Sequence, residues 1–470
     1  MSEDRTFDLV IAANRLPVDR ETHDDGSVTW RRSPGGLVTA MESVMRGREG
    51  AWIGWSGNPG DAPEPFHQDD MYLHPVPLTE REVGDYYEGF SNGSLWPLYH
   101  DVIVPATFKR RWRAAYETVN RRFAEAAATI TATGGTVWVQ DYQLQEMPAM
   151  LRELRPDVRI GWFNHIPFPP VELFMQLPRR EDLLLGLLGA DFLGFQRKPD
   201  ADNFLRACRQ LLDVSVEGDE VRLPDGRIAR AAAVPISIDT SALAELATTP
   251  QVQERAAEIR RQLGDPEHLL LGVDRLDYTK GIRHRLKAMG ELYAEGALDP
   301  RTVKLIQVAT PSRERLAAYQ QIRGEVERTV GQINGDYSPI GATAVTYLHR
   351  SFPREEMAAM FVAADVMLVT PLRDGMNLVA KEYVACHGDD GAMVLSEFTG
   401  AALELEQAHL CNPHDIARLK DTIIRAIESP IADRERRMRT MRRQVMTNDV
   451  QRWAELFLAA LAAAPERPAQ

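Results

Sequence analysis

The sequence predicts an α/β protein with two successive parallel sheets. Short runs rich in β-branched residues alternate with longer segments of helical apolar spacing, a pattern typical of parallel strands joined by crossover helices. The alternation starts again after residues 231–239. A chain of 470 residues is long enough for two or three domains, so we expect two doubly wound domains with a boundary near residues 235–240.

The expected strands can be placed in order along the chain. In the first half they occupy residues 8–14, 51–57, 136–142, 159–166 and 191–196. In the second half, strands with their following turns occupy residues 268–281, 303–313, 344–352, 366–375 and 392–400. Amphipathic helices are expected between them, for example over residues 312–333.

Composition excludes several classes of protein. The contents of 44% hydrophobic and 26% charged residues are those of a globular protein, and no apolar stretch approaches the roughly 20 residues of a membrane span. The N-terminus lacks a signal-peptide pattern, so we expect a cytoplasmic protein without a membrane partner. A formal charge of -13 disfavours nonspecific binding of nucleic acid. The odd set of Cys208, Cys386 and Cys411 without CxxC spacing indicates buried free thiols.

Polar side chains follow several of these strands, where ligands bind in doubly wound sheets. In "PLRDGMNLVAKE", residues 371–382, Gly375 allows close backbone approach and the start of a helix can bind a diphosphate. The amides expected there belong to Met376, Asn377, Leu378 and Val379. Asp374 is placed to accept hydrogen bonds from sugar hydroxyls, and Glu382 from a ribose diol. The alternative is that Asp374 caps the helix and that Arg373 and Glu382 form surface pairs.

Two further loops of the second half carry cations. Arg275 and Lys280 precede Gly281 in one loop, an arrangement suited to a departing phosphate group. Arg313 follows the next strand. The alternative for all three cations is a solvated position.

The first half offers weaker signals. Arg15 follows the first strand, and Gly35 with Gly36 resembles a phosphate loop without matching GxGxxG or a P-loop. Asp141 and His165 end two later strands, although a single His at such a position is more often structural. The aromatic residues of "YYEGFSNGSLWP" can form core or stack on sugars, and they are Tyr86, Tyr87 and Trp96.

Taken together, the ordered motifs resemble the bacterial trehalose-6-phosphate synthases. They include "ANRLP", "SPGGL", "WIGWSG", "WVQDYQL", "NHIPFP", "DRLDYTKG", "TPSRE", "INGDY" and "TPLRDGMNLVAKEYVA", and they extend from about residue 9 to residue 453. The resemblance implies a GT-B fold, with two Rossmann-like domains facing each other across a cleft. Residues 1–238 would bind the acceptor and residues 239–452 the nucleotide sugar, with a last helix near 453–465 packing back on the first domain.

The resemblance also implies roles for the donor-site residues. Arg275 and Lys280 would bind the diphosphate, and Asp374 with the backbone of Gly375 to Val379 would hold the glucose. Glu382 would bind the ribose and His165 the 6-hydroxyl of the sugar. Phe352 would lie beside the base, and Gly36 would lie in a loop that closes over the donor. Catalysis would then depend on Arg275, Lys280, Asp374 and His165, with no metal.

Acceptor binding is implied for a second set of residues. This set comprises Arg15, Tyr87, Trp96 and Arg313 at the phosphate, Asp141 at sugar hydroxyls, and Trp55 at the sugar face. Trp52 is the alternative to Trp55.

The reaction implied is retaining transfer of glucose from a nucleotide-diphosphate glucose to glucose 6-phosphate, giving α,α-trehalose 6-phosphate. No cofactor beyond these substrates is expected, and either UDP-glucose or GDP-glucose could be the donor. Alternatives are a synthase of glucosylglycerol phosphate or of a pseudo-sugar phosphate, and a non-catalytic sugar-phosphate sensor. We expect a homo-oligomer and a separate phosphatase that acts on the product.

Overall fold

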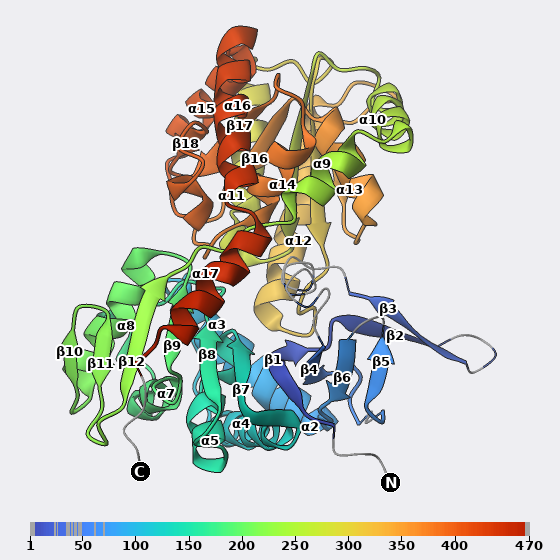
Figure 1. The fold of residues 1–470 in the computed structure, drawn as a ribbon. Helices are drawn as coiled ribbons and strands as arrows, with labels where there is room; N and C mark the ends of the chain where they lie inside the picture. Colours follow the sequence, from blue (N-terminus) through green and yellow to red (C-terminus); the bar gives the residue numbers. More distant parts are fainter. Residues whose placement is uncertain are drawn as a thin grey trace. The chain divides into compact units, whose positions relative to one another are not determined.

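The computed structural model describes residues 5–22, 25, 27–33, 38, 41, 45, 49–60, 63–68 and 71–465. The chain divides into two compact units, unit 1 (Met1–Ile236 and Gln451–Gln470) and unit 2 (Ser237–Val450). Each unit contains a largely parallel sheet with helices against it (Figure 1). The predicted α/β class with two parallel sheets is confirmed, and every strand expected from the sequence is present.

The sheet of unit 1 has the strand order β10-β11-β12-β9-β8-β7-β1-β4-β6-β5. Its strands are β1 (Phe7–Arg15), β4 (Gly50–Trp55), β5 (Phe66–Gln68), β6 (Met71–Pro75), β7 (Thr131–Gln140), β8 (Arg159–Phe163), β9 (Phe192–Phe195), β10 (Ser215–Glu217), β11 (Glu220–Arg222) and β12 (Ile228–Ala233). The helices of this unit are α2 (Glu80–Glu82), η1 (Val83–Leu95), α3 (Trp96–Tyr99), α4 (Arg110–Ile130), η2 (Tyr142–Leu144), α5 (Met147–Leu154), α6 (Val171–Phe174), α7 (Arg180–Leu187), α8 (Lys198–Leu211) and α17 (Val450–Ala462).

Strand order in unit 1 reverses direction beside β1. The chain runs from β1 to β4 and β6 on one side, and then returns to β7, β8 and β9 on the other. Strand β1 is parallel to both of its neighbours, β4 and β7. Ligands of doubly wound sheets bind beyond the carboxyl ends of the strands at such a reversal. A ligand site in unit 1 is therefore expected at the carboxyl ends of β8, β7, β1 and β4.

Helix α17 packs on the sheet of unit 1. The rings of Trp453 and Phe457 lie 5.1 Å and 4.2 Å from the ring of Trp138 on β7. Gly161 and Gly194 face this helix, and a Cβ atom at either position would overlap the Phe457 ring. Two glycines thus make room for an aromatic side chain that fixes the last helix to the first sheet.

The sheet of unit 2 has the order β15-β14-β13-β16-β17-β18. Its strands are all parallel: β13 (His268–Arg275), β14 (Val303–Thr310), β15 (Val345–Leu348), β16 (Val366–Val369), β17 (Ala392–Ser396) and β18 (His409–Cys411). Its helices are α9 (Thr240–Ala247), α10 (Pro250–Gln262), η3 (Tyr278–Lys280), α11 (Ile282–Ala294), α12 (Ala317–Tyr337), α13 (Arg354–Ala363), α14 (Leu378–Cys386), η4 (Gly400–Leu403), α15 (Ile416–Glu428) and α16 (Ile431–Thr447). The reversal here lies between β13 and β16.

The helix expected over residues 312–333 begins later, at Ala317. Arg313 has a φ of 48°, which is left-handed and cannot continue a right-handed helix. Its guanidinium also forms an ion pair with Asp277 on the neighbouring loop. Tertiary contact therefore overrides the helical spacing of the first residues.

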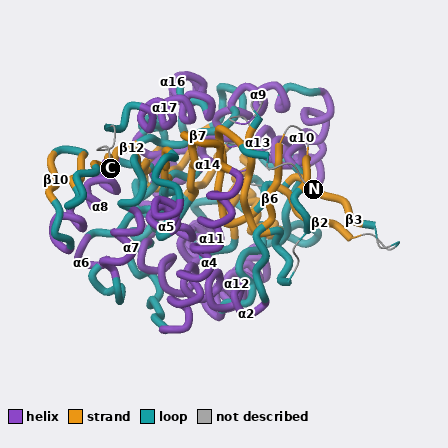
Figure 2. Tube along the Cα trace, turned by 60° about the horizontal axis from the view of Figure 1, so that its bottom comes forward, coloured by secondary structure: helices purple, strands orange, loops and turns teal. Residues whose placement is uncertain are grey.

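A separate hairpin of β2 (Val18–Thr22) and β3 (Val28–Arg32) projects from unit 1 in both the ribbon and the tube view (Figures 1 and 2). The three thiols are buried and free, as expected. Among the described residues, no helix has the length and apolar character that crossing a membrane requires.

Candidate active site

In unit 2, the loops after β13 and β16 are in contact. Arg275 is the exposed last residue of β13, and Lys280 ends the short helix η3. Gly281 follows with a φ of 64°, and a Cβ atom there would overlap the carbonyl oxygen of Thr370 after β16. Only glycine allows this close approach, which brings Lys280 to the loop that carries Asp374.

Lys280 and Asp374 form a largely buried ion pair, with 2.5 Å between Nζ and Oδ2. Their side chains are only 12% and 13% exposed. Asn377 donates from Nδ2 to the same Asp374 oxygen at 3.1 Å. A cation and a carboxylate are thus fixed together at the strand ends where the order of the sheet reverses.

Helix α14 starts two residues later than the sequence suggested, at Leu378. Asn377, with a φ of 76°, is its N-cap, and its Oδ1 accepts the amide of Ala380. The alternative in which Asp374 caps this helix is therefore wrong, because Asp374 is turned toward Lys280. Leu378 and Val379 are half-buried at the first turn, where helix amides favour an anion. Gly375 and Met376 are buried in the loop before it.

Glu382 lies on α14, four residues after Leu378, and is half-buried. Burial raises the pKa of this carboxyl to about 7, although the charge of Arg354 acts in the opposite direction. In the part of the chain that is described, the Glu382 carboxylate has no hydrogen-bond partner or ion pair. The surface-pair alternative does not hold for Glu382, and a half-buried carboxylate without such a pair can accept hydrogen bonds from a ligand.

The loop after β14 is tied to the loop after β13. Arg313 Nη1 lies 3.2 Å from Asp277 Oδ2, and these side chains are 4% and 0% exposed. Tyr319 donates its hydroxyl to the same Asp277 oxygen at 2.7 Å. Burial acts to raise the pKa of Asp277, but the positive charges of Arg313 and Arg275 outweigh it, and the pKa is lowered. Arg313 is therefore a buried, paired cation rather than a solvated residue.

Phe352 follows β15, the strand beside β14. It is half-buried, and the guanidinium of Arg350 lies 4.7 Å from its ring centroid. The ring is thus placed beyond the strand ends of unit 2, where a planar base could stack.

In unit 1, three of the expected acceptor residues come together. The guanidinium of Arg15, at the end of β1, lies 5.2 Å from the ring of Trp55, at the end of β4. The ring of Tyr87, on η1, lies 6.2 Å from that of Trp55. Arg15 also pairs with Asp19 at 2.7 Å. A Cβ atom at Gly57 would overlap the Arg15 guanidinium, so this glycine leaves the space that Arg15 occupies.

Trp52 and Trp96 have different surroundings. Trp52 is 1% exposed and donates its indole N–H to the backbone oxygen of Arg15 at 2.9 Å, so it holds the backbone that carries Arg15. Trp96 is also buried, and its ring lies 4.1 Å from His100 and 5.7 Å from Tyr142. Gly36 lies outside the described residues.

Asp141 and His165 meet at the ends of β7 and β8. Asp141 has a φ of 70°, a strained value that often marks functional positions. Its Oδ1 accepts the backbone N–H of His165 at 3.0 Å. The His165 ring lies with Nε2 2.8 Å from Gln140 Oε1. Burial lowers the pKa of His165 to about 3, so the ring is neutral at physiological pH.

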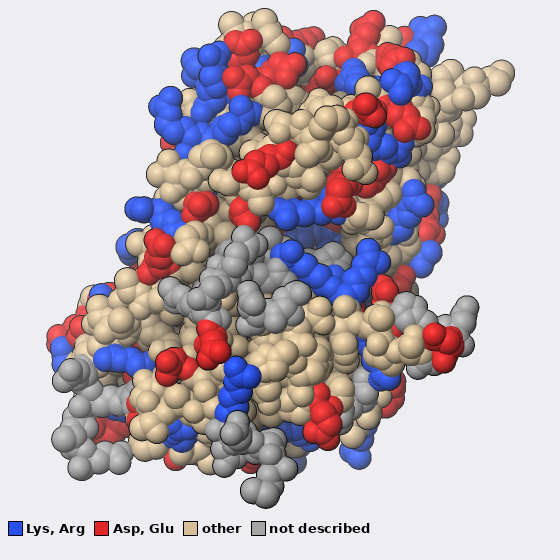
Figure 3. Space-filling model, turned by 45° about the vertical axis from the view of Figure 1, so that its right-hand side comes forward, with Lys and Arg blue, Asp and Glu red and all other residues tan. Residues whose placement is uncertain are grey.

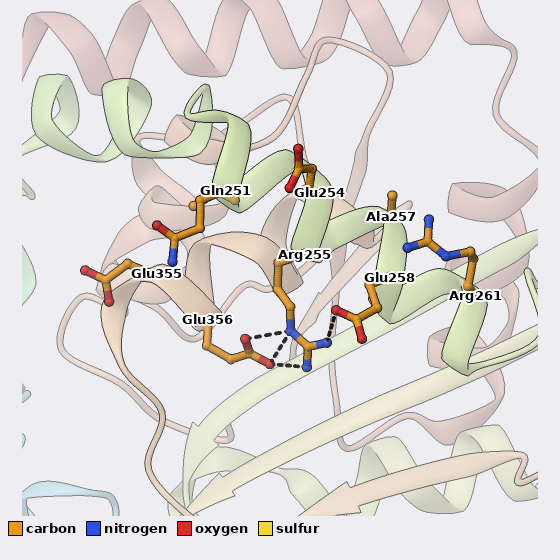
Figure 4. Close-up of a pocket in the computed structure, with 9 residues that line it drawn as sticks. Gln251, Glu254, Arg255, Ala257, Glu258, Arg261, Glu355 and Glu356 are labelled. Atoms are coloured by element: carbon orange, nitrogen blue, oxygen red, sulfur yellow. Dashed lines mark hydrogen bonds and ion pairs between the residues drawn. The ribbon is translucent and has the colours of Figure 1, made fainter.

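The surface charge is mixed, and one pocket of unit 2 lies away from the residues expected at the site. Acidic and basic side chains are interspersed over the face drawn in Figure 3. A surface pocket of about 580 Å³ lies on unit 2 beside α10 (Figure 4). Its Arg255 is paired with Glu258 and Glu356, and no residue expected at the site lines it. Among the described residues, no group of three or more His, Cys, Asp or Glu side chains could hold a metal ion.

Sequence reasoning missed the residues that hold several of the candidate side chains in place. They are Gln140 behind His165, Asp277 behind Arg313, and the side chain of Asn377 behind Asp374. Asp277 lies within the quoted loop motif, but its partner is 36 residues away in sequence. A contact of that kind has no local sequence signal.

The sequence and the fold are similar to those of known glycosyltransferases. Residues 8–463 match the model of glycosyltransferase family 20. The trehalose-6-phosphate synthase of Mycobacterium avium is 57% identical over 469 residues, which cover 97% of this chain and 95% of that protein.

Two solved structures support the same assignment. The α,α-trehalose-phosphate synthase (UDP-forming) of Burkholderia vietnamiensis is 34% identical, with a TM-score of 0.90 and coverage of 99% of this chain and 98% of that one. The enzyme of Burkholderia xenovorans in complex with glucose-6-phosphate is 33% identical, with a TM-score of 0.89 and coverage of 97% and 100%. The chain described here therefore belongs to glycosyltransferase family 20 and is a trehalose-6-phosphate synthase by activity.

Proposed function

We propose that unit 2 binds a nucleotide-diphosphate glucose and that unit 1 binds glucose 6-phosphate for retaining transfer to α,α-trehalose 6-phosphate. The observation that carries this proposal is the Lys280–Asp374 pair at the ends of β13 and β16. A diphosphate needs fixed cations, and a sugar needs fixed hydrogen-bond acceptors. This pair offers both at the reversal of a doubly wound sheet.

Donor binding divides among the residues of unit 2. Arg275 and Lys280 contact the diphosphate, together with the first-turn amides of α14. Lys280 has three N–H donors, so it can keep Asp374 and still donate to a phosphate oxygen. Asp374 accepts hydrogen bonds from the glucose, and Glu382 accepts them from the ribose. Phe352 lies beside the base.

Acceptor binding is assigned to the following residues. Arg15, Tyr87 and Trp96 of unit 1 bind the phosphate of glucose 6-phosphate, and Trp55 contacts the sugar face. Asp141 accepts hydrogen bonds from acceptor hydroxyls. Arg313 is a further candidate cation for that phosphate, and Asp277 holds it in place.

The chemical step breaks the bond between the glucose C1 atom and the diphosphate oxygen. A new bond forms between that carbon and the C1 hydroxyl oxygen of glucose 6-phosphate, on the same face of the ring. The proton of that hydroxyl passes to the departing diphosphate. Cationic side chains stabilise the charge that develops there, and the protein otherwise positions the two sugars.

The proposal is tested with purified protein, glucose 6-phosphate and equal concentrations of UDP-glucose or GDP-glucose. The Burkholderia relatives are described as UDP-forming, which favours UDP-glucose as the donor. Formation of trehalose 6-phosphate and UDP would support the proposal. Transfer to glycerol 3-phosphate with none to glucose 6-phosphate would overturn the acceptor assignment, and no transfer at all would favour a sensor.

Replacing Arg15 by alanine is expected to raise the KM for glucose 6-phosphate about 10- to 100-fold, because a charged hydrogen bond contributes roughly 1.5–3 kcal/mol. The KM for the donor should change little. The control is Arg31→Ala on strand β3, whose side chain is 69% exposed and pairs with Glu21 on the hairpin. An unchanged acceptor KM in Arg15→Ala would remove this residue from the phosphate site.

Affinity for UDP-glucose is expected to fall as the pH is lowered from 8 to 6. Glu382 has a folded-state pKa of about 7, raised by burial, so its protonated fraction grows as the pH falls through this value. The protonated form accepts fewer hydrogen bonds from a ribose diol. Isothermal titration calorimetry measures the effect, and in Glu382→Gln the affinity should be lower at pH 8 and nearly independent of pH. Equal pH dependence in both proteins would show that Glu382 does not bind the donor.

A further inference from the structure

Gln140 contacts the ring of His165, and no role has yet been assigned to Gln140. It is the last residue of β7, is fully buried, and has its Oε1 2.8 Å from His165 Nε2. Strands β7 and β8 are parallel neighbours, with Gln140 opposite Phe163. The register therefore carries Gln140 to the sheet edge where His165 lies, two residues after Phe163.

The chemistry of this contact fixes the proton on the ring. An amide oxygen only accepts hydrogen bonds, so His165 Nε2 must carry the N–H. A neutral imidazole has one N–H, and burial keeps this ring neutral by lowering its pKa to about 3. Nδ1 is then left with a lone pair. Within the described residues it has no hydrogen-bond partner, while the backbone N–H of His165 is held by Asp141.

The NH2 group of the Gln140 amide indicates that packing alone does not account for a glutamine at this position. Its Nε2 is buried and has no hydrogen-bond partner among the described residues. Burying an unpaired amide N–H is costly, and an apolar side chain of similar size would avoid that cost. Among the described residues, the contact with His165 is the hydrogen bond of the Gln140 side chain, and leucine could not supply it.

We propose that Gln140 is a positioning residue that holds His165 in its Nε2–H form, so that Nδ1 accepts a hydrogen bond from the 6-hydroxyl of the transferred sugar. The proposal rests on the proposed function, together with the role that the family resemblance implies for His165, which is contact with that hydroxyl. It adds a direction to the contact: the sugar donates and the protein accepts. A donor sugar without this hydroxyl would gain nothing from Gln140.

The proton position can be measured on the wild-type protein. Two-bond ¹H–¹⁵N correlation spectra of ¹⁵N-histidine-labelled protein distinguish protonated from unprotonated ring nitrogens, and the His165 signals are assigned by their loss in His165→Ala. We expect a protonated Nε2 and an unprotonated Nδ1 at pH 7, and a mixture of forms in Gln140→Leu. A proton on Nδ1 in the wild-type protein would overturn the proposal.

Kinetics with two donors test the consequence for the sugar. With UDP-glucose, Gln140→Leu is expected to lower kcat/KM about tenfold, the effect of one hydrogen bond. With UDP-6-deoxyglucose, the variant and the wild-type protein should have similar kcat/KM values. The matched control is Gln145→Leu, because Gln145 is equally buried but bonds Tyr99 instead of His165. Equal losses with both donors in Gln140→Leu would show a purely structural role.

The His165→Ala variant separates this inference from the proposed function. If His165→Ala loses the same factor with both donors, the assignment of His165 to the 6-hydroxyl fails. If His165→Ala discriminates between the donors and Gln140→Leu does not, the donor assignment stands and the role of Gln140 fails.

Discussion

Replacing Lys280 by alanine is expected to lower kcat about 100-fold or more. A preorganised donor aimed at developing charge contributes roughly 3 kcal/mol to the transition state, and Lys280 is held in place by Asp374. Steady-state kinetics with saturating glucose 6-phosphate measure the loss. The control is Lys287→Ala on α11, because the Lys287 side chain is 63% exposed and makes only a 3.9 Å contact with Glu291.

Arg275→Ala is expected to show a loss of the same order, because Arg275 ends β13, the strand that leads into the loop of Lys280. Its control is Arg283→Ala, an exposed cation of α11 that pairs with Glu325. Rates close to those of the wild-type protein in both Lys280→Ala and Arg275→Ala would mean that neither cation meets the leaving group.

Replacing Asp374 by alanine is expected to lower kcat/KM for the nucleotide sugar by about 100-fold or more. The substitution removes the acceptor for the sugar hydroxyls and also leaves Lys280 without its partner. Truncating one member of a buried, hydrogen-bonded charge pair costs roughly 2–5 kcal/mol. Asp299→Ala is the control, because Asp299 pairs with Arg301 on an exposed loop.

A double-mutant cycle isolates the coupling between Lys280 and Asp374. Groups in direct contact give non-additive effects, so the double variant should lose less activity than the product of the single losses. The melting temperatures of all variants should be compared, because partial unfolding would also lower the measured activity. Strict additivity would show that the pair does not act as a unit, and a normal donor kcat/KM in Asp374→Ala would remove Asp374 from the sugar site.

The sequence alone was sufficient for much of the fold. Alternation of strand and helix patterns predicted the α/β class and every long buried strand, because such strands read as continuous apolar runs. Short or exposed elements gave no such signal. The hairpin of β2 and β3 and the brief edge strands β5, β10 and β18 were missed for this reason. The start of α12 was misplaced because a tertiary ion pair holds Arg313 out of the helix.

At the candidate site, sequence reasoning proposed side chains for ligand binding but missed the residues that hold those side chains in place. Lys280 and Asp374 follow strands, so their meeting at one sheet edge could be predicted from topology. The distance between the two side chains could not be predicted from topology. Gln140 looked like an ordinary strand residue, and its role depends on the register between β7 and β8. The sequence favoured Trp55 with Trp52 as the alternative, and the structure places the Arg15 guanidinium against the Trp55 ring.

A crystal structure of this protein with an intact, non-transferable nucleotide glucose would test the donor site most directly. We expect the diphosphate within hydrogen-bond distance of Arg275 and Lys280, with the glucose hydroxyls at Asp374. A well-ordered nucleotide sugar bound elsewhere, with Lys280 still paired only to Asp374, would contradict this expectation.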